Sequence, residues 1–290
     1  MKKALFFLII FLSSSALAQE KEINPEDSSR IKGHVYHVNV WGSLGFTVAG
    51  QLAILIAQKT FSKPEITAQE FDAAQLPSSV NSINVIDRWA LRLGQPKTDF
   101  TWTAVAIQAA CAAAPLTLFF GERYRKNWDD IVLMLLEVNT LATCMFQFSP
   151  FGPFFQNRFR PAVYYAKDSV SRYEERNGGE RNSLFSGHEN SAAASLFCMA
   201  KIYCDHNPQI QGWDKFGIYA LASVPPLIMG CFRVIALRHF PTDVIVGGII
   251  GGTCGIIVPE FHRITGNNVS IGLYSPPGGG TGMSLAWNLP

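Results

Sequence analysis

The chain has 290 residues, of which 48% are hydrophobic and only 16% are charged. Soluble proteins carry about 25% charged residues, so this composition points toward a membrane. The net charge of +2 is too small for a nucleic-acid reader, and no basic stripe with interleaved aromatic residues occurs along the chain. A nucleic-acid partner is therefore excluded.

The first twenty residues, MKKALFFLIIFLSSSALAQE, have the layout of a bacterial export signal. Two lysines precede an apolar run, and Ala16-Leu17-Ala18 fits a cleavage site of small residues. We therefore predict a signal peptide over residues 1–18. The alternative is an uncleaved first membrane anchor, for which the apolar run is short.

Six further apolar blocks follow, separated by polar loops. They cover residues 38–57, 101–120, 130–148, 189–204, 216–236 and 242–258. A membrane-spanning helix needs about twenty mostly apolar residues. We therefore predict an all-α fold, a helical bundle of about five to six mostly transmembrane helices. The mean hydropathy of +0.14 is modest, so a soluble bundle of buried helices is the alternative.

A short basic loop between the second and third blocks predicts the orientation of the bundle. In GERYRKNWDD, the residues Arg123, Arg125 and Lys126 lie close to two apolar ends, and such residues stay in the cytoplasm. The segment 149–188 and the connection at 233–243 would then face the periplasm.

A cleaved signal conflicts with this orientation if the block at 38–57 also crosses the membrane, because the mature chain would start outside. Either this block does not cross, or the first segment is not a conventional signal. We expect the former, since Gly42, Gly45, Gly50, Asn39 and Gln51 weaken the block as a span.

The last stretch, VSIGLYSPPGGGTGMSLAWNLP, alternates apolar residues on either side of a Pro/Gly turn. This pattern predicts a small hairpin, a short β-like tail after the helices. The six cysteines lie mostly inside apolar segments and form no C-x-x-C pair. We expect them to be small buried side chains.

Three polar stretches carry the residues that could do chemistry: NRFRP at 157–161, FSGH at 185–188 and FRVIALRHFPTD at 232–243. In the third, His239 and Asp243 are four residues apart, so a helix starting near Pro241 would let the carboxylate bond one imidazole nitrogen. Such a bond fixes the tautomer and leaves the other nitrogen free to attack or to accept a proton. Arg233 could fold back to the same pocket.

In the second stretch, Ser186 and Gly187 come just before an apolar helix. The free backbone N–H groups and the dipole of a helix N-terminus favour an anion. His188 would stand beside that anion in the first turn. Taken singly, His188 is as well explained as a capping or surface residue, and Asp243 as an ordinary acid in the first turn of a helix. Their joint occurrence on one face of the membrane favours a site.

In order and spacing, these stretches resemble the motifs of the type 2 phosphatidic acid phosphatase superfamily, which includes lipid phosphate phosphatases, bacterial non-specific acid phosphatases and vanadium haloperoxidases. The third motif is matched by Arg233, His239 and Asp243, the second by Ser186-Gly187-His188 and the first by Arg160-Pro161. The resemblance covers roughly residues 84–262, and the third motif is its most specific part.

The resemblance implies that His239 is the nucleophile that forms a phosphohistidine, that Asp243 orients it and that His188 is the general acid for the leaving alcohol. It implies that the phosphoryl oxygens, where transition-state charge develops, are held by Arg160, Arg233, Ser186 and the Gly187 amide. It implies no cofactor and no metal ion.

The chain departs from the family pattern at three positions. Pro153 stands where the first motif has a lysine, and loss of a charged donor to phosphate costs roughly 1.5–3 kcal/mol. Arg158 or Lys167 are the candidates to supply the missing charge. Phe185 replaces the proline before Ser186, Phe232 replaces the serine before Arg233, and we expect both phenylalanines to be wall residues of the site.

These observations divide the chain into a signal peptide at 1–18, an N-terminal periplasmic or membrane-associated segment at 19–83, a phosphatase-like core at 84–262 and a tail at 263–290. The expected function is metal-independent hydrolysis of a phosphomonoester or pyrophosphate of a membrane lipid. The enzyme would lie in a bacterial inner membrane, with its active site facing the periplasm and a phosphorylated lipid as its partner.

Several alternatives remain open at this stage. They are a secreted soluble acid phosphatase, a catalytically impaired protein that binds phospholipid, and a vanadate-dependent haloperoxidase. The sequence chooses neither the lipid nor the oligomeric state.

Overall fold

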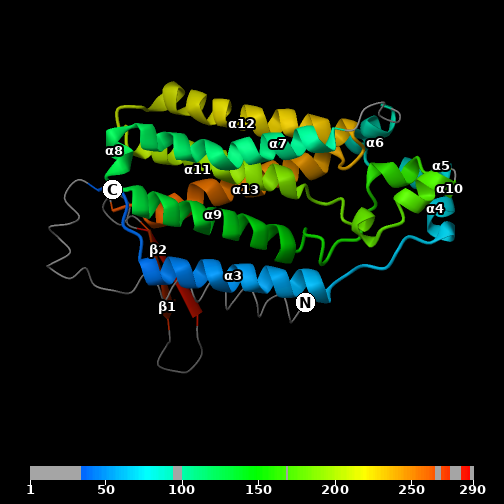
Figure 1. Ribbon diagram of the computed structural model, residues 1–290, viewed down its shortest axis with the longest axis horizontal. Coiled ribbons are helices and arrows are strands. Elements are labelled where there is room, and N and C mark those ends of the chain that lie inside the picture. The colour runs from blue at the N-terminus through cyan, green and yellow to red at the C-terminus, as the bar shows by residue number, and fades with distance from the viewer. Residues whose placement is uncertain (1–33, 94–99, 168, 265–268, 275–281, 288–290) are drawn as a thin grey trace.

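The computed structural model describes residues 34–93, 100–167, 169–264, 269–274 and 282–287. The predicted signal peptide lies outside these residues. Six long helical segments run side by side in one bundle (Figure 1). They are α3 (Val40–Thr60), α7 (Thr101–Ala113) continued by the 3-10 helix η1 (Ala114–Phe120), α9 (Trp128–Phe148), α11 (Gly187–Asp205), α12 (Gly212–Ile235) and α13 (Pro241–Phe261). Each predicted apolar block falls on one of them, which confirms the all-α bundle.

Five of these segments are long and apolar enough to cross a membrane: Val40–Thr60, Trp102–Phe120, Trp128–Phe148, Gly212–Ile235 and Pro241–Phe261. The sixth, α11, packs against α7, α9, α12 and α13 and is mostly buried among them. Its small residues and buried Glu189 and Asn190 lower its hydropathy, because it faces protein rather than lipid. The fold is therefore an all-α, mostly transmembrane bundle.

The short elements gather mainly at one end of the bundle, here called the loop-rich end, formed by residues 61–93, 149–167, 169–186 and 236–240 (Figure 1). They are α4 (Ala68–Ala74), α5 (Pro77–Ser82), α6 (Val85–Leu91), η2 (Pro161–Tyr164), α10 (Ser169–Glu174) and η3 (Gly178–Arg181). The opposite end carries α8 (Glu122–Arg125) in the short basic loop, and there Arg123 bonds the carbonyl oxygen of His206 at 3.0 Å.

The tail forms the expected hairpin. Strand β1 (Val269–Tyr274) pairs antiparallel with β2 (Gly282–Trp287), with Val269 opposite Trp287 and Tyr274 opposite Gly282. The predicted Pro/Gly turn at 275–281 lies outside the described residues. All six cysteines are free, and all but Cys231 are buried, as expected for most of them.

The expectation that residues 38–57 stay out of the membrane is not supported. Helix α3 has the length and hydropathy of a span and packs along α9. Its polar residues are accommodated inside the bundle: the Gln51 amide donates to the Thr140 hydroxyl at 3.2 Å, and Ser43 is buried. Gly50 is buried as well, whereas Gly45 lies on the exposed side of the helix. Part of the polar and small residues of this block therefore contact protein, and α3 belongs to the bundle.

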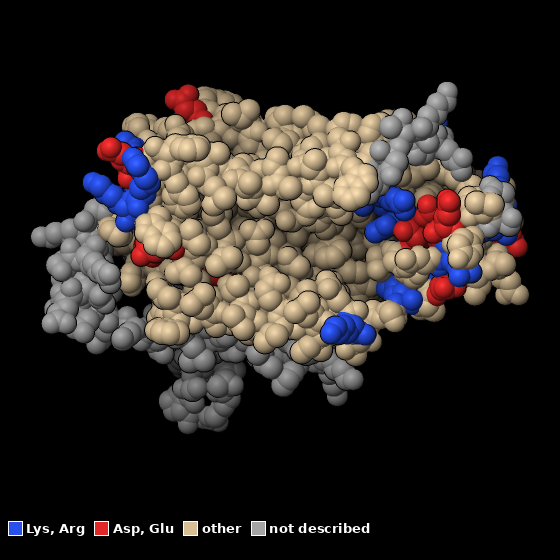
Figure 2. All heavy atoms as spheres, in the orientation of Figure 1, with Lys and Arg blue, Asp and Glu red and all other residues tan. Residues whose placement is uncertain are grey.

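The surface agrees with a membrane-spanning bundle. Charged side chains gather at the two ends, and a broad uncharged band separates them on the face shown in Figure 2. Exposed tryptophans mark both edges of this band: Trp41, Trp128 and Trp213 begin α3, α9 and α12 at the basic-loop end, and Trp102 begins α7 at the loop-rich end. Tryptophan is enriched at the two interfaces of a bilayer.

The closest helix contact lies between α11 and α13 and depends on glycine. Gly247, Gly251 and Gly255 share one face of α13, four residues apart. A methyl group on them would lie 2.6, 2.0 and 2.4 Å from the carbonyl oxygens of Ser186, Asn190 and Ala194. Only glycine allows the two backbones to approach this closely, as in other membrane helix pairs.

We expect Gly251→Ala to destabilise the fold by about 1–3 kcal/mol, because the added methyl group meets backbone that cannot move aside. The check is the thermal unfolding midpoint of detergent-purified protein. Gly248→Ala is the matched control on the same helix, since its methyl group would meet only the Glu189 side chain, at ordinary distances of 3.5 Å from Oε1 and 3.7 Å from Cγ. Equal midpoints for the two variants would contradict the close contact.

Candidate active site

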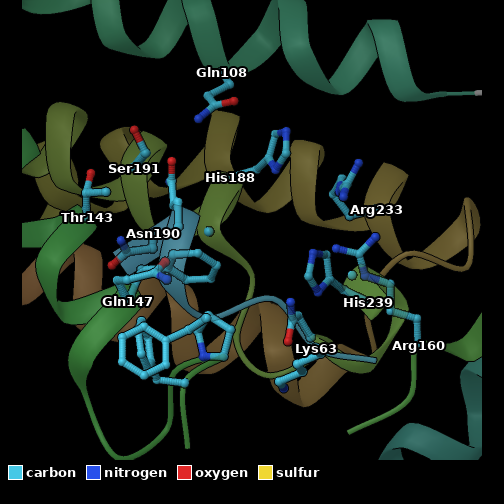
Figure 3. A pocket seen from close by; sticks show the side chains of 18 residues that line it. Lys63, Gln108, Thr143, Gln147, Arg160, His188, Asn190, Ser191, Arg233 and His239 are labelled. Carbon is cyan, nitrogen blue, oxygen red and sulfur yellow. The ribbon is translucent and has the colours of Figure 1, made fainter. Parts of the chain in front are cut away.

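A cavity of about 500 Å³ lies at the loop-rich end, between the ends of the long helices (Figure 3). Five of the seven predicted site residues line it: Arg160, Gly187, His188, Arg233 and His239. Residues from three distant parts of the sequence therefore meet there. The other two, Ser186 and Asp243, are fully buried and lie outside the lining residues.

His239 lies in the turn between α12 and α13, with 3% of its surface exposed. Its Nδ1 atom lies 2.8 Å from the carbonyl oxygen of Ser183. A carbonyl only accepts, so Nδ1 carries the proton and Nε2 keeps its lone pair. Burial, followed by the charges of Arg160 and Arg233, holds the pKa of His239 well below its usual value. The ring is therefore neutral, with Nε2 available at the cavity.

Asp243 does not bond His239 directly, contrary to the sequence-based expectation. Its Oδ2 lies 4.0 Å from the imidazole Nδ1, which is too far for a hydrogen bond. Instead the carboxylate accepts from the Ser183 hydroxyl at 2.6 Å and from the Phe240 N–H at 2.8 Å. Asp243 thus positions Ser183, and the Ser183 carbonyl oxygen in turn positions the His239 ring. The Asp243 carboxylate also caps the start of α13.

The first turn of α11 presents Gly187 and His188 to the cavity. The helix begins there because Ser186 is its N-cap, with the hydroxyl accepting from the Glu189 N–H at 3.4 Å. Ser186 therefore serves as the N-cap of α11 in this structure. The imidazole of His188 makes no hydrogen bond to the described residues, so its ring nitrogens are available to a substrate.

The two predicted arginines reach the cavity from different elements. Arg233 comes from the last turn of α12, and the turn after it folds back so that the His239 N–H contacts the Arg233 carbonyl oxygen at 3.3 Å. Arg160 is held by Glu180, whose carboxylate accepts from its guanidinium at 3.1 Å. Both cations therefore line the same cavity as His239, as a phosphate-binding site would require.

The positive charge missing from the first motif is supplied from an unexpected part of the chain. Pro153 does line the cavity, but so does Lys63, which follows α3. The Lys63 ammonium donates to the carbonyl oxygens of Gln156 and, at 3.3 Å, of Arg181. A close backbone contact positions this segment, because a methyl group on Gly178 would lie 2.0 Å from the Lys63 carbonyl oxygen.

Neither candidate replacement for that lysine lines the cavity. Arg158 is committed to buried carboxylates: it bonds Asp87 at 2.5 Å and also bonds Asp243, and its guanidinium lies 4.4 Å from the centre of the Phe240 ring. This network ties α6 to the start of α13. Lys167 is exposed in a loop and does not line the cavity.

The expectation for the two phenylalanines is wrong, since neither Phe185 nor Phe232 lines the cavity. Phe185 is fully buried, with its ring centre 5.4 Å from that of Phe146. Phe232 packs on Phe100, with ring centres 5.1 Å apart. Both phenylalanines therefore pack against other aromatic rings outside the cavity lining. The phenylalanines that do line the cavity are Phe61, Phe146 and Phe154, and Phe146 is the one that packs on Phe185.

Uncharged polar side chains line the part of the cavity away from the arginines. Figure 3 shows Thr143, Gln147, Asn190 and Ser191 on one side and Arg160, Arg233 and His239 on the other, with His188 between them. Gln108 approaches from α7. Sequence reasoning missed this set, because single amides and hydroxyls on separate apolar helices form no motif.

The described residues contain no group of three or more His, Cys, Asp or Glu side chains that could hold a metal ion. The family model described as the PAP2 superfamily matches residues 131–265, from α9 to just beyond α13. This match supports membership of the type 2 phosphatidic acid phosphatase superfamily.

This membership supports a phosphatase-type function in general. The match contains all seven predicted site residues but not Lys63. A search of curated proteins found no match, and a search of solved structures found none either.

Proposed function

We propose that this protein is a membrane-embedded phosphatase that hydrolyses the phosphomonoester or pyrophosphate of a lipid through a phosphohistidine on His239. The observation that carries the proposal is the meeting of His239, with Nε2 unprotonated, and the cations Arg160, Arg233 and Lys63 at one cavity. A cluster of three cations without a lining carboxylate is suited to a doubly charged phosphoryl group.

In the first step, Nε2 of His239 attacks phosphorus while the bond to the leaving oxygen breaks. Burial, followed by the charges of Arg233 and Arg160, lowers the pKa of His188 to about 4 in the free protein, so in this scheme the bound phosphate dianion stabilises the protonated ring. The protonated His188 donates its proton to the leaving oxygen, so a neutral alcohol departs. In the second step, His188 takes a proton from water, the water oxygen attacks phosphorus, and the phosphorus–nitrogen bond breaks. Inorganic phosphate leaves and both histidines return to their starting states.

Asp243 and Ser186 act behind the cavity in this scheme. Asp243 orients Ser183, and the Ser183 carbonyl holds the proton on Nδ1 of His239 throughout. Ser186 fixes the start of α11, which directs the Gly187 and His188 backbone toward the phosphate. We therefore assign both as positioning residues.

The position of the cavity supports a lipid substrate. The cavity lies among helices that carry the apolar band, at the loop-rich end where α7 begins with exposed Trp102, so a phosphate in the cavity can remain attached to an acyl chain in the bilayer. The same band disfavours a secreted soluble phosphatase. Lys63 restores a third cation at the cavity, which disfavours a relic that has lost turnover.

We place the protein in a bacterial inner membrane with the cavity on the periplasmic side, because the short basic loop around Arg123 lies at the opposite end. With α3 crossing the membrane, residues 34–39 then lie in the cytoplasm, so the first segment is not a conventional cleaved signal. An impermeant thiol reagent should label Gln69→Cys but not Lys126→Cys in spheroplasts of a Cys231→Ser strain. The reverse pattern would contradict this orientation.

Phosphate release by detergent-purified protein tests the proposed reaction. Wild-type protein should release phosphate from a lipid phosphate in EDTA, because the scheme uses no metal ion. His239→Ala should abolish release, and His188→Ala should slow it by roughly 10²–10⁴-fold, the usual contribution of general acid–base catalysis. Release by His239→Ala at the wild-type rate would refute the scheme.

The pH dependence tests the role of Lys63. Burial, followed by the charge of Arg181, lowers the Lys63 pKa to about 8. The ammonium is thus charged below that pH and neutral above it, so kcat/KM should fall as the pH rises through about 8. Lys63→Arg should move this fall to higher pH, because arginine keeps its charge.

Lys63→Gln should lower kcat/KM at pH 7 by roughly 10–100-fold, the equivalent of one lost charged hydrogen bond to phosphate. Lys59→Gln is the control, since Lys59 is exposed on the same segment and does not line the cavity. An unchanged pH profile in Lys63→Arg, together with full activity in Lys63→Gln, would remove Lys63 from the site.

A further inference from the structure

The cavity has two chemically different parts. Lys63, Arg160 and Arg233 with His239 form a cationic half, and the neutral half is formed by Gln108, Thr143, Gln147, Asn190 and Ser191. None of the described residues that line the neutral half is charged. His188 stands where the two halves meet, as Figure 3 shows.

The neutral half lies deeper in the bundle than the nucleophile. At 1.5 Å per helical residue, Gln108 lies about 10 Å along α7 from its first residue, Thr101, at the loop-rich end. Thr143 lies about 7 Å before the end of α9 by the same measure. A group bound there points from the loop-rich end toward the middle of the apolar band.

The side chains of this half have hydrogen-bonding capacity to spare. Asn190 is 1% exposed, and its amide donates to the Ala142 carbonyl oxygen at 2.8 Å, but its Oδ1 has no partner among the described residues. The side-chain amides of Gln108 and Gln147 make no hydrogen bond to the described residues. Buried polar groups are normally paired, so this set fits a polar ligand.

The direction of the proposed reaction assigns this half to the leaving group. In an in-line displacement, the leaving oxygen lies on the far side of phosphorus from the attacking nitrogen. His188 protonates that oxygen, and beyond His188 lie the amides and hydroxyls of the neutral half. The part of the substrate next to the leaving oxygen therefore enters the neutral half.

Resting on the proposed function, we infer that the site selects phosphomonoesters whose alcohol carries ester, amide or hydroxyl groups next to the leaving oxygen. Acylated glycerol and acylated amino sugars share this chemistry. A polyprenyl pyrophosphate fits less well, because its second phosphate would enter a half with no cation. A simple alkyl phosphate leaves the amides unpaired, which lowers its transition-state binding.

The test compares kcat/KM for four substrates in detergent: phosphatidic acid, lipid A phosphate, dodecyl phosphate and a polyprenyl pyrophosphate. We expect at least one of the first two to exceed both of the others by tenfold or more. Which of those two is preferred distinguishes a glycerolipid from a sugar lipid as the source of the alcohol.

Two variants then locate the selectivity. Gln108→Leu and Thr143→Val should each lower the ratio of kcat/KM for the preferred lipid to that for dodecyl phosphate by about 3–10-fold. Thr253→Val is the matched control: both threonine hydroxyls donate to the carbonyl four residues earlier at 2.7 Å, but Thr253 is exposed outside the cavity. It should leave the ratio unchanged.

This inference would be overturned by a kcat/KM for dodecyl phosphate equal to that for the acylated lipids, by a preference for the polyprenyl pyrophosphate, or by an unchanged ratio in both variants. Each of these results would leave His239-dependent hydrolysis intact. Absence of release from every substrate, or release that persists in His239→Ala, would instead overturn the proposed function and this inference with it.

Discussion

The direct contact between the backbones of α11 and α13 determines the geometry on which the rest of the site depends. His188 is in the first turn of α11, and His239 lies just before α13, so the distance between the two histidines follows from how closely these helices approach. Gly247 lies against the Ser186 carbonyl oxygen, at the N-cap of α11. The close contact therefore extends to the residue next to the first turn and places both histidines at one cavity.

Around His239, a second set of contacts replaces the simple histidine–carboxylate pair. The Ser183 carbonyl binds Nδ1 of His239, Asp243 binds the Ser183 hydroxyl, and Arg158 binds Asp243. Because Arg158 also binds Asp87 of α6, a segment from before the family match supports the third motif. The chemical consequence is the same as for a direct pair, since Nε2 remains the unprotonated nitrogen.

Much of this arrangement could be predicted from the sequence. Apolar length located all six bundle helices, and the spacing of Arg233, His239 and Asp243 placed the third motif at the start of α13. Residue type and order also placed Arg160 and His188 at one site. These features are local, or follow a family pattern, so they are visible without coordinates.

Other features depend on contacts between distant segments and could not be predicted. Lys63 reaches the cavity because Gly178 and Arg181, more than a hundred residues later, dock its segment there. Helix α3 was misjudged because contacts within the bundle accommodate some of its polar residues: Gln51 bonds Thr140 of α9, and Ser43 is buried. Arg158 looked available for phosphate, but Asp87 and Asp243 hold it, and neither partner is adjacent in sequence.

The most direct test of this account is the position of the phosphoryl group in a trapped intermediate. Protein mixed with a phosphorylated substrate and quenched in base, where phosphohistidine survives, should carry phosphate on His239, and on its Nε2 atom because Nδ1 donates to the Ser183 carbonyl. His188→Ala protein, given an aryl phosphate that needs no acid, should accumulate this species. Phosphate on Nδ1, on another residue, or on no residue during turnover would contradict the account.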